Sequence, residues 1–220
     1  MKDVYKRTSD PASEEDIKSI EADTARGLSR EKFRGQFDEF DALLYCGFHN
    51  SSVPRQVTGA LNKTLMGVLD ASILAALSLV QDDSHWGIVT KSSFLQEHIT
   101  NAVYKFLGQQ PTTQNTRFKG VFAPAASSSA PEKSEKAQDQ DQDAQLFEAA
   151  KRLFQSGNVT CVIMGATDFR GMAPIIRRAA SDVYGPDRGW GVFLVNHLHA
   201  GVDHLRLQSR ARHSYRQAHR

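Results

Sequence analysis

Short, continuous apolar runs recur along the chain, and longer stretches with helical spacing separate them. Because these runs are apolar throughout instead of alternating with polar residues, they indicate strands that are covered on both faces, which is typical of a parallel sheet. The sequence therefore predicts an α/β fold, with parallel sheets flanked by helices. The runs are FDALLYC (40–46), WGIVT (86–90), FKGVF (118–122), VTCVIMG (159–165) and GVFLVN (191–196).

The stretches between these runs supply the crossover helices that a parallel sheet needs. Residues 59–80 are expected to form a buried helix, because their nearly uncharged part is interrupted by Asp70 and is too short and too polar to span a bilayer. An earlier helix is expected over 13–27, with Ser13 as its N-cap and acids in its first turn. The remaining helices are expected over 94–107, 144–155, 172–183 and from Leu198 onward.

One segment, 123–145, interrupts the pattern. It has almost no apolar side chain larger than alanine, so burial cannot offset the entropy that ordering would cost. We expect a disordered insertion there. The chain is accordingly divided into a first lobe (1–122), the insertion (123–145), a second lobe (146–207) whose closing helix packs back on the first lobe, and a basic tail (208–220).

Length and charge constrain the class of protein. A chain of 220 residues with a formal net charge of +2 can bury one good core and does not by itself call for a polyanionic partner. The stretch from 204 to 220 holds five arginines and no acid. It lacks regularly interleaved aromatics and a long apolar face, so it reads as a solvated tail, with neither nucleic acid nor membrane as partner.

The amino end and the two cysteines indicate the compartment. The first residues, MKDVYKRTSDPASEEDI, contain no apolar core of the kind that a secretory signal needs, so we expect a cytoplasmic protein. Cys46 and Cys161 both lie in strand-like runs of this chain, which favours reduced thiols over a disulfide.

Ligands of open parallel sheets bind outside the carboxyl ends of the strands, so the residues after each strand are the candidates for function. No phosphate-binding loop, dinucleotide fingerprint or paired metal-binding motif occurs in the sequence, and no metal site is expected. The segments that follow the strands are all small or polar: Cys46 to Ser52, Thr90 to Ser93, Gly165 to Gly171 and Asn196 to His199.

The blocks around these strand ends occur in a recognisable order. DALLYCGFHNSSVP, TLMGVLDAS, WGIVTKSS, VIMGATDFRGM and VFLVNHLHAGVDHL together resemble the aspartate/glutamate/hydantoin racemase superfamily, within it the hydantoin-racemase and fungal DCG-like branch. The resemblance implies two similar α/β lobes with the active site in the cleft between them. It also implies a small-molecule substrate, two cysteines (one per lobe), no metal or organic cofactor, and association into homo-oligomers.

Carried over position by position, the resemblance gives this chain one of the two cysteines. Cys46 stands where the family has its first catalytic cysteine, and Ala166 occupies the place of the second. Cys161 does not replace it, because it lies five residues earlier, inside the strand. Members also begin with a further strand and substrate loop, so we expect the first lobe to be truncated at its amino end.

Racemisation without a cofactor needs a base on one face of the carbon acid and an acid on the other, which a thiolate and a thiol can supply. The thiolate must be favoured by its surroundings, since a free cysteine has a pKa of about 8.5. His49 and Asn50 are expected to donate hydrogen bonds to the thiolate or the substrate. The alternative to a catalytic role is a structural one, in which Cys46 is a small buried apolar side chain.

The other strand ends supply candidate binding groups. Thr90 and Ser92 are expected to bind a substrate carboxylate, although Ser92 or Ser93 could equally serve as the cap of the helix that starts at Phe94. Thr167 is expected to bind the other side of the substrate, next to Ala166. His197 is either structural or the titratable replacement for the second cysteine.

Three functions remain open at this point. The first is a cofactor-independent racemase or isomerase acting on an amino-acid-derived or hydantoin-like carbon acid through Cys46, impaired by the loss of the second thiol. The second is one-cysteine decarboxylation. The third is a non-catalytic, ligand-binding descendant of the family.

Overall fold

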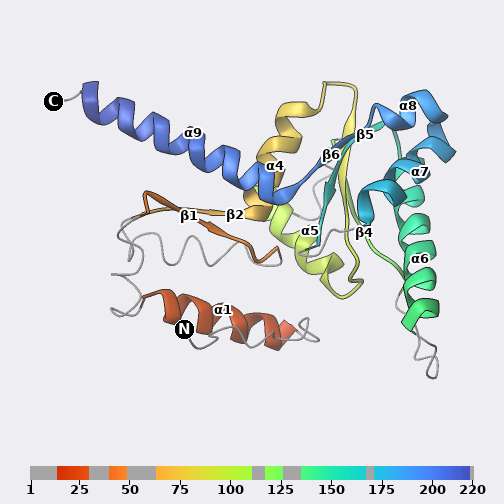
Figure 1. Ribbon diagram of the computed structural model, residues 1–220, viewed down its shortest axis with the longest axis horizontal. Helices are drawn as coiled ribbons and strands as arrows, with labels where there is room; N and C mark the ends of the chain where they lie inside the picture. Colours follow the sequence, from red (N-terminus) through yellow and green to blue (C-terminus); the bar gives the residue numbers. More distant parts are fainter. Residues whose placement is uncertain are drawn as a thin grey trace.

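The structure is a computed structural model, and it describes residues 14–29, 40–48, 63–110, 117–125, 135–166 and 171–218 (Figure 1). The chain starts with α1 (Glu14–Ser29) and β1 (Ala42–Tyr45), and then alternates between strands and helices. The elements that follow are β2 (Thr64–Gly67), α4 (Val68–Leu79), β3 (His85–Val89), α5 (Leu95–Phe106), β4 (Phe118–Phe122), α6 (Glu135–Gln155), β5 (Val159–Met164), α7 (Met172–Tyr184), α8 (Pro186–Trp190), β6 (Phe193–Val195) and α9 (His197–Ala218).

Four of the strands form one parallel sheet in the order β4-β3-β5-β6. One face of it carries Trp86, Ile88 and Ile163, which pack with α4 and α5. The other face carries Val162 and Met164, which pack with α6 and α7. Cover on both faces explains why these strands are apolar throughout, and it confirms the predicted α/β fold with parallel strands.

The other two strands, β1 and β2, pair in parallel as a separate small sheet. Helices α4 and α9 connect the two sheets: α9 contacts β1, β2 and α4, while α4 also contacts β5 and β6. The approach of α9 to β1 depends on a glycine. A Cβ atom at Gly201 would lie 2.5 Å from a terminal carbon of Leu44, so a larger residue there would push the helix away from the strand.

The helix expected over 59–80 is wrong in its first half, because Thr64–Gly67 forms strand β2 and helix α4 starts only at Val68. Residues 59–62 lie outside the described part. A run of four residues, TLMG, is too short for its periodicity to separate strand from helix, and pairing with β1 decides in favour of the strand.

The segment 123–145 also differs from its expected disorder. Residues 126–134 lie outside the described part, but α6 begins at Glu135, so 135–145 are helical. Its four Gln, two Ala, one Glu and one Lys favour a helix, and the stretch continues into the packed turns from Leu146 onward.

The expected lobe boundary after residue 122 does not follow the sheets either, since β3, which precedes the boundary, pairs with β5, which follows it. Helix α9 also runs through most of the expected tail, to Ala218.

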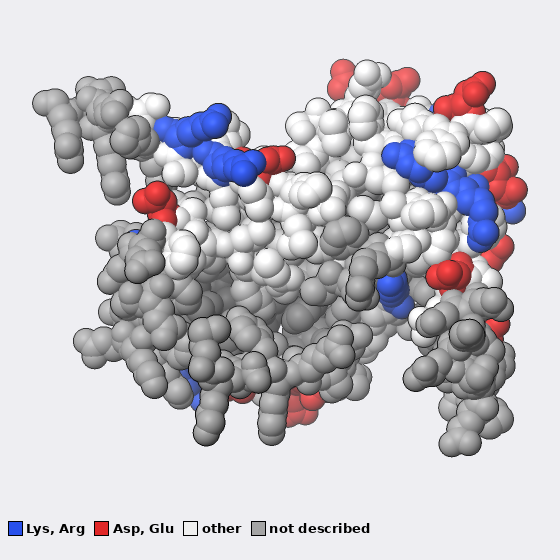
Figure 2. All heavy atoms as spheres, viewed as in Figure 1, with Lys and Arg blue, Asp and Glu red and all other residues white. Residues whose placement is uncertain are grey.

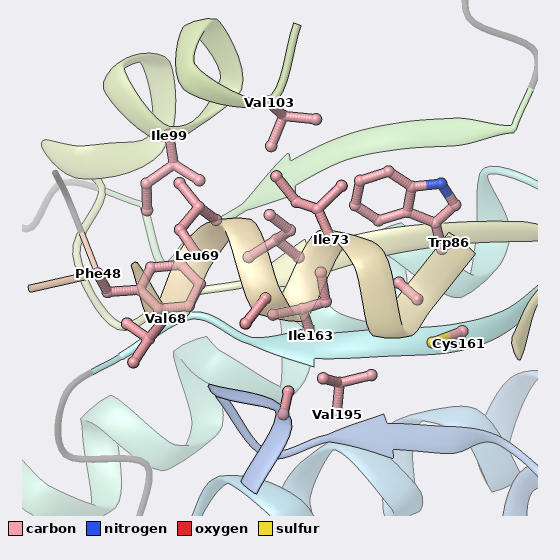
Figure 3. Close-up of a cluster of buried hydrophobic side chains, with 14 of the residues drawn as sticks. Phe48, Val68, Leu69, Ile73, Trp86, Ile99, Val103, Cys161, Ile163 and Val195 are labelled. Atoms are coloured by element: carbon pink, nitrogen blue, oxygen red, sulfur yellow. The ribbon is translucent and has the colours of Figure 1, made fainter. Parts of the chain in front are cut away.

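The larger core cluster extends from the middle of the sheet to the carboxyl ends of its strands. Trp86 and Cys161 lie at one end of it, and Phe48 lies at the other beside Val68 and Leu69 (Figure 3). Phe48 is 1% exposed. The segment after β1 is therefore anchored in the same core as the four-stranded sheet. None of the helices in the described part of the chain is long and apolar enough to cross a membrane.

Candidate active site

Cys46 immediately follows β1, at the carboxyl edge of the small sheet. The register pairs Tyr45 with Gly67, so Cys46 emerges alongside Val68, the first residue of helix α4. Its side chain is exposed, and its thiol donates a weak hydrogen bond to the carbonyl oxygen of Leu44 at 3.8 Å. An accessible thiol therefore stands at a strand end, beside the amino end of a buried helix.

The described surroundings of Cys46 favour the neutral thiol. Partial burial raises the pKa of Cys46 above its ordinary value, and no neighbouring charge opposes this effect among the described residues. His49 and Asn50, which are predicted from the sequence to stabilise the thiolate, lie outside the described part. In the described environment Cys46 is a proton donor at neutral pH, and it becomes a base only as the pH rises.

Phe48 connects the segment of Cys46 to the end of β5. A Cβ atom at Gly165 would lie 3.2 Å from Cε1 of Phe48 and 2.6 Å from Cγ2 of Ile88, so only glycine fits between them. Gly165 also donates a backbone hydrogen bond to the carbonyl of Val89 at 2.7 Å, which extends the β3–β5 ladder by one residue. The ends of β1, β3 and β5 are thereby held together.

His197 is fully buried at the start of α9, with its ring packed edge-on against Phe48 at 5.6 Å between centroids. Burial lowers the pKa of His197, and a hydrogen bond to the backbone of Met164 opposes this in part. The imidazole is therefore kept neutral inside the fold. Asn196, just before it, caps α9 by accepting hydrogen bonds from the amides of Leu198 and His199. This environment supports the structural alternative for His197.

Thr90 lies at the end of β3 with 1% of its surface exposed. Its amide donates to the carbonyl of Phe122 at 2.9 Å, and its hydroxyl oxygen accepts a hydrogen bond from the amide of Ser92 at 3.4 Å. Helix α5 begins at Leu95 without a side-chain cap, so Ser92 does not cap it. The pair forms a polar turn at the same sheet edge as Gly165.

Ala166 is half-buried after β5, next to Gly165, and Thr167 lies outside the described part. Cys161 is fully buried within β5, and burial raises its pKa to about 12, so it is an inert core thiol. Of the residues predicted for the site, the described ones (Cys46, Thr90, Ser92, Ala166 and His197) all lie at carboxyl ends of strands. No cluster of potential metal ligands occurs in the described ranges.

This arrangement coincides with a family match over nearly the whole chain. The model of the family described as Asp/Glu/Hydantoin racemase matches residues 3–205. The chain belongs to this racemase family. A search of curated proteins found no match to the chain.

Solved structures of racemases share the fold of this family member. A glutamate racemase, isoform RacE1, from Bacillus anthracis is similar with a TM-score of 0.59 and 15% identity, over 94% of this chain and 69% of that one. An allantoin racemase from Klebsiella pneumoniae is similar with a TM-score of 0.54 and 15% identity, over 84% and 66%. A cysteine mutant of arylmalonate decarboxylase in a sulfate-associated form gives 0.50 and 14%, over 90% and 77%. At these identities the likeness concerns the fold.

The structure of this racemase-family chain also shows residues near the strand ends that were not predicted from the sequence as site residues. Asp70 is 8% exposed in the first turn of α4, close in the chain to the end of β2. An acid within an otherwise apolar run was the available signal for it. Phe48 and Gly165 carried no such signal, because their importance depends on a contact between segments that are more than a hundred residues apart.

Proposed function

We propose that this chain is a cofactor-independent protein of the hydantoin-racemase branch, acting on a small amino-acid-derived or hydantoin-like carbon acid. Cys46 exchanges the proton on one face of the acidic carbon. The observation that carries the proposal is the exposed Cys46 thiol at the carboxyl edge of β1, with Ala166 after β5 where the family has its second cysteine. Similarity to an allantoin racemase supports the hydantoin branch, because allantoin itself contains a hydantoin ring.

In the proposed site, the end of β3 binds the substrate and the end of β1 carries the proton-transfer group. Thr90, whose hydroxyl oxygen accepts from the amide of Ser92, has its hydroxyl proton available for a substrate carboxylate. His49, Asn50 and Thr167 complete substrate binding in this proposal. The thiolate of Cys46 takes the proton from carbon, the electron pair enters the adjacent carbonyl, and the thiol returns a proton to the same face. Inversion needs delivery from the opposite face, where alanine has no proton to give.

Deuterium exchange tests whether Cys46 transfers a proton on one face of the substrate without inverting it. Amino acids, hydantoins and small dicarboxylates incubated with the protein in deuterium oxide should include one that exchanges its α-proton with little inversion. Replacing Ala166→Cys should raise inversion relative to exchange, and Cys46→Ala should abolish both. Cys161→Ala is the matched control, because it removes a thiol from the core and leaves Cys46 in place.

Three outcomes would contradict the proposal. Fast inversion by the unmodified protein that persists in His197→Gln would reveal a second acid/base elsewhere. Exchange that survives Cys46→Ala would remove the thiol from the mechanism. Absence of exchange from every substrate, even with Ala166→Cys, would favour a ligand-binding protein without catalysis.

A second candidate function is decarboxylation with one thiol. The raised pKa of Cys46 favours it, because a neutral thiol is ready to protonate a carbanion on one face. Similarity to arylmalonate decarboxylase is in agreement. Release of carbon dioxide from disubstituted malonates, lost in Cys46→Ala, would distinguish this function from proton exchange.

A further inference from the structure

Tyr45 is the last residue of β1 and directly precedes Cys46. Its other neighbour, Leu44, points towards α9, where Gly201 leaves room for it. Because successive side chains of a strand point to opposite faces, Tyr45 stands on the other face of β1. Its side chain is half-buried. A phenol that no part of the proposed mechanism uses therefore lies next to the proposed reactive thiol.

Two glycines leave room for the ring of Tyr45. The register places Gly67 directly across from it on β2, where glycine offers no side chain. Two residues further along the chain, a Cβ atom at Gly47 would lie 2.5 Å from the hydroxyl oxygen of Tyr45 and 2.6 Å from its Cζ. The ring thus leans along the strand and lies over Gly47, with its hydroxyl beside the backbone. This direction is towards the carboxyl edge, where ligands of parallel sheets bind.

No cation acts at close range on the thiol of Cys46 in the described part of the chain, because burial alone raises its pKa. On the face shown in Figure 2, Lys and Arg atoms gather over α9 and over α7, and the described surface between the two groups is uncharged. An anion at this thiol therefore needs a neutral donor. Tyrosine hydroxyls are among the side-chain donors that stabilise such charge in enzymes.

We propose that the hydroxyl of Tyr45 donates a hydrogen bond to the substrate oxygen next to the acidic carbon. This role rests on the function proposed above, in which Cys46 removes the proton and the electron pair enters the adjacent carbonyl. That oxygen gains negative charge as the C–H bond breaks, and a fixed donor stabilises the charge. The oxygen is two bonds from the carbon that meets the sulfur, so a donor one residue from Cys46 is suitably placed. In an amino acid, Thr90 and Tyr45 would bind the two oxygens of one carboxylate.

Two alkylating reagents test the role of Tyr45 without relying on catalysis. Iodoacetate and iodoacetamide both react at a carbon next to a carbonyl, but only iodoacetate carries a carboxylate. The ratio of their rates at Cys46 does not depend on the thiolate fraction, which is the same for both reagents at one pH. In Tyr45→Phe, the rate with iodoacetate relative to iodoacetamide should fall roughly five- to tenfold, because hydrogen bonds to charged acceptors are about twice as strong as neutral ones.

Two further variants serve as a second test and as a control. Gly47→Ala should lower the same ratio with Tyr45 intact, because the added Cβ displaces the phenol. Tyr104→Phe is the matched control, since Tyr104 is a half-buried tyrosine on α5 that packs edge-on against Phe118, with centroids 5.8 Å apart. It should leave the ratio unchanged. Mass spectrometry of the peptide that contains Cys46 measures each rate.

Deuterium exchange connects the hydroxyl to the proposed chemistry. With a substrate that the unmodified protein exchanges, Tyr45→Phe should slow the exchange about a hundredfold, as loss of one oxyanion donor does. The two proposals fail separately. Absence of exchange by the unmodified protein contradicts proton transfer by Cys46, whereas the alkylation ratio still decides whether Tyr45 binds an oxygen beside this thiol.

Three results would overturn the role of Tyr45. The first is an alkylation ratio that stays the same in Tyr45→Phe or in Gly47→Ala. The second is an equal fall of the ratio in Tyr104→Phe, which would trace the effect to a general loosening of the fold. The third is exchange at the full rate in Tyr45→Phe.

Discussion

The ring of Phe48 meets the imidazole of His197 edge-on, with centroids 5.6 Å apart, although 149 positions separate the two in the sequence. Phe48 lies two residues after Cys46, and His197 is the first residue of α9. The contact therefore joins the segment of the reactive thiol to the helix that ties the small sheet to the rest of the chain. Four expected outcomes follow from this region.

Replacing Phe48→Ala should destabilise the protein by about 3–5 kcal/mol, because it leaves a cavity where the two sheets meet. The free energy of unfolding in urea measures the loss. Phe40→Ala is the matched control: Phe40 is 53% exposed just before β1, so its removal should change stability by no more than about 0.5 kcal/mol. Similar losses from both variants would show that Phe48 is not an anchor.

Gly165→Ala should destabilise the protein by about 1–3 kcal/mol, since the added Cβ collides with Ile88 and Phe48. Gly27→Ala should have the opposite effect, because a Cβ at Gly27 meets no atom within 4 Å and alanine favours the helix α1 by about 1 kcal/mol. Thermal unfolding of the two single variants compares them. A neutral Gly165→Ala would contradict the close approach of β5 to Phe48.

Burial of His197 should make the folded protein less stable in acid. Its pKa is lower in the folded protein than in the unfolded chain, so below the unfolded pKa of about 6.5 the unfolded state binds more protons. The contribution of this residue to the unfolding free energy should therefore fall as the pH drops from about 6.5 to the folded pKa, by at most about 1.4 kcal/mol per pH unit.

Urea unfolding at several pH values, in the unmodified chain and in His197→Phe, measures the contribution of His197. The pH dependence should be flatter in the variant, because phenylalanine keeps a ring against Phe48 and cannot titrate. The same slope in both proteins would place the acid sensitivity elsewhere.

The two thiols should differ sharply in reactivity. Iodoacetamide attacks the thiolate, so labelling of the exposed Cys46 should increase with pH and reach half its maximum above the ordinary thiol range. Cys161 should stay unlabelled in the folded protein, because it is buried and its pKa is raised to about 12. Peptide mapping after brief alkylation compares the two. Preferential labelling of Cys161 would remove the reason for centring the site on Cys46.

Local patterns in the sequence were sufficient to predict most strands, the position of Cys46 and the family. The five apolar runs predicted β1, β3, β4, β5 and β6, because a strand covered on both faces must be apolar along its whole length. The position of Cys46 after the first run followed from the same pattern. The order of the strand-end blocks indicated the racemase family, which the family match over residues 3–205 confirms.

The tertiary structure decided what those patterns leave open. Thr64–Gly67 is a strand because β1 lies beside it, and no local property of these four residues specifies that partner. Asp70 and His197 are buried because α4 and α9 pack between the two sheets, so their burial depends on segments far away in the chain. Periodicity records which face of an element is apolar, whereas burial and strand pairing depend on what covers that face. For Phe48, Gly165 and His197, the covering residues come from distant parts of the sequence.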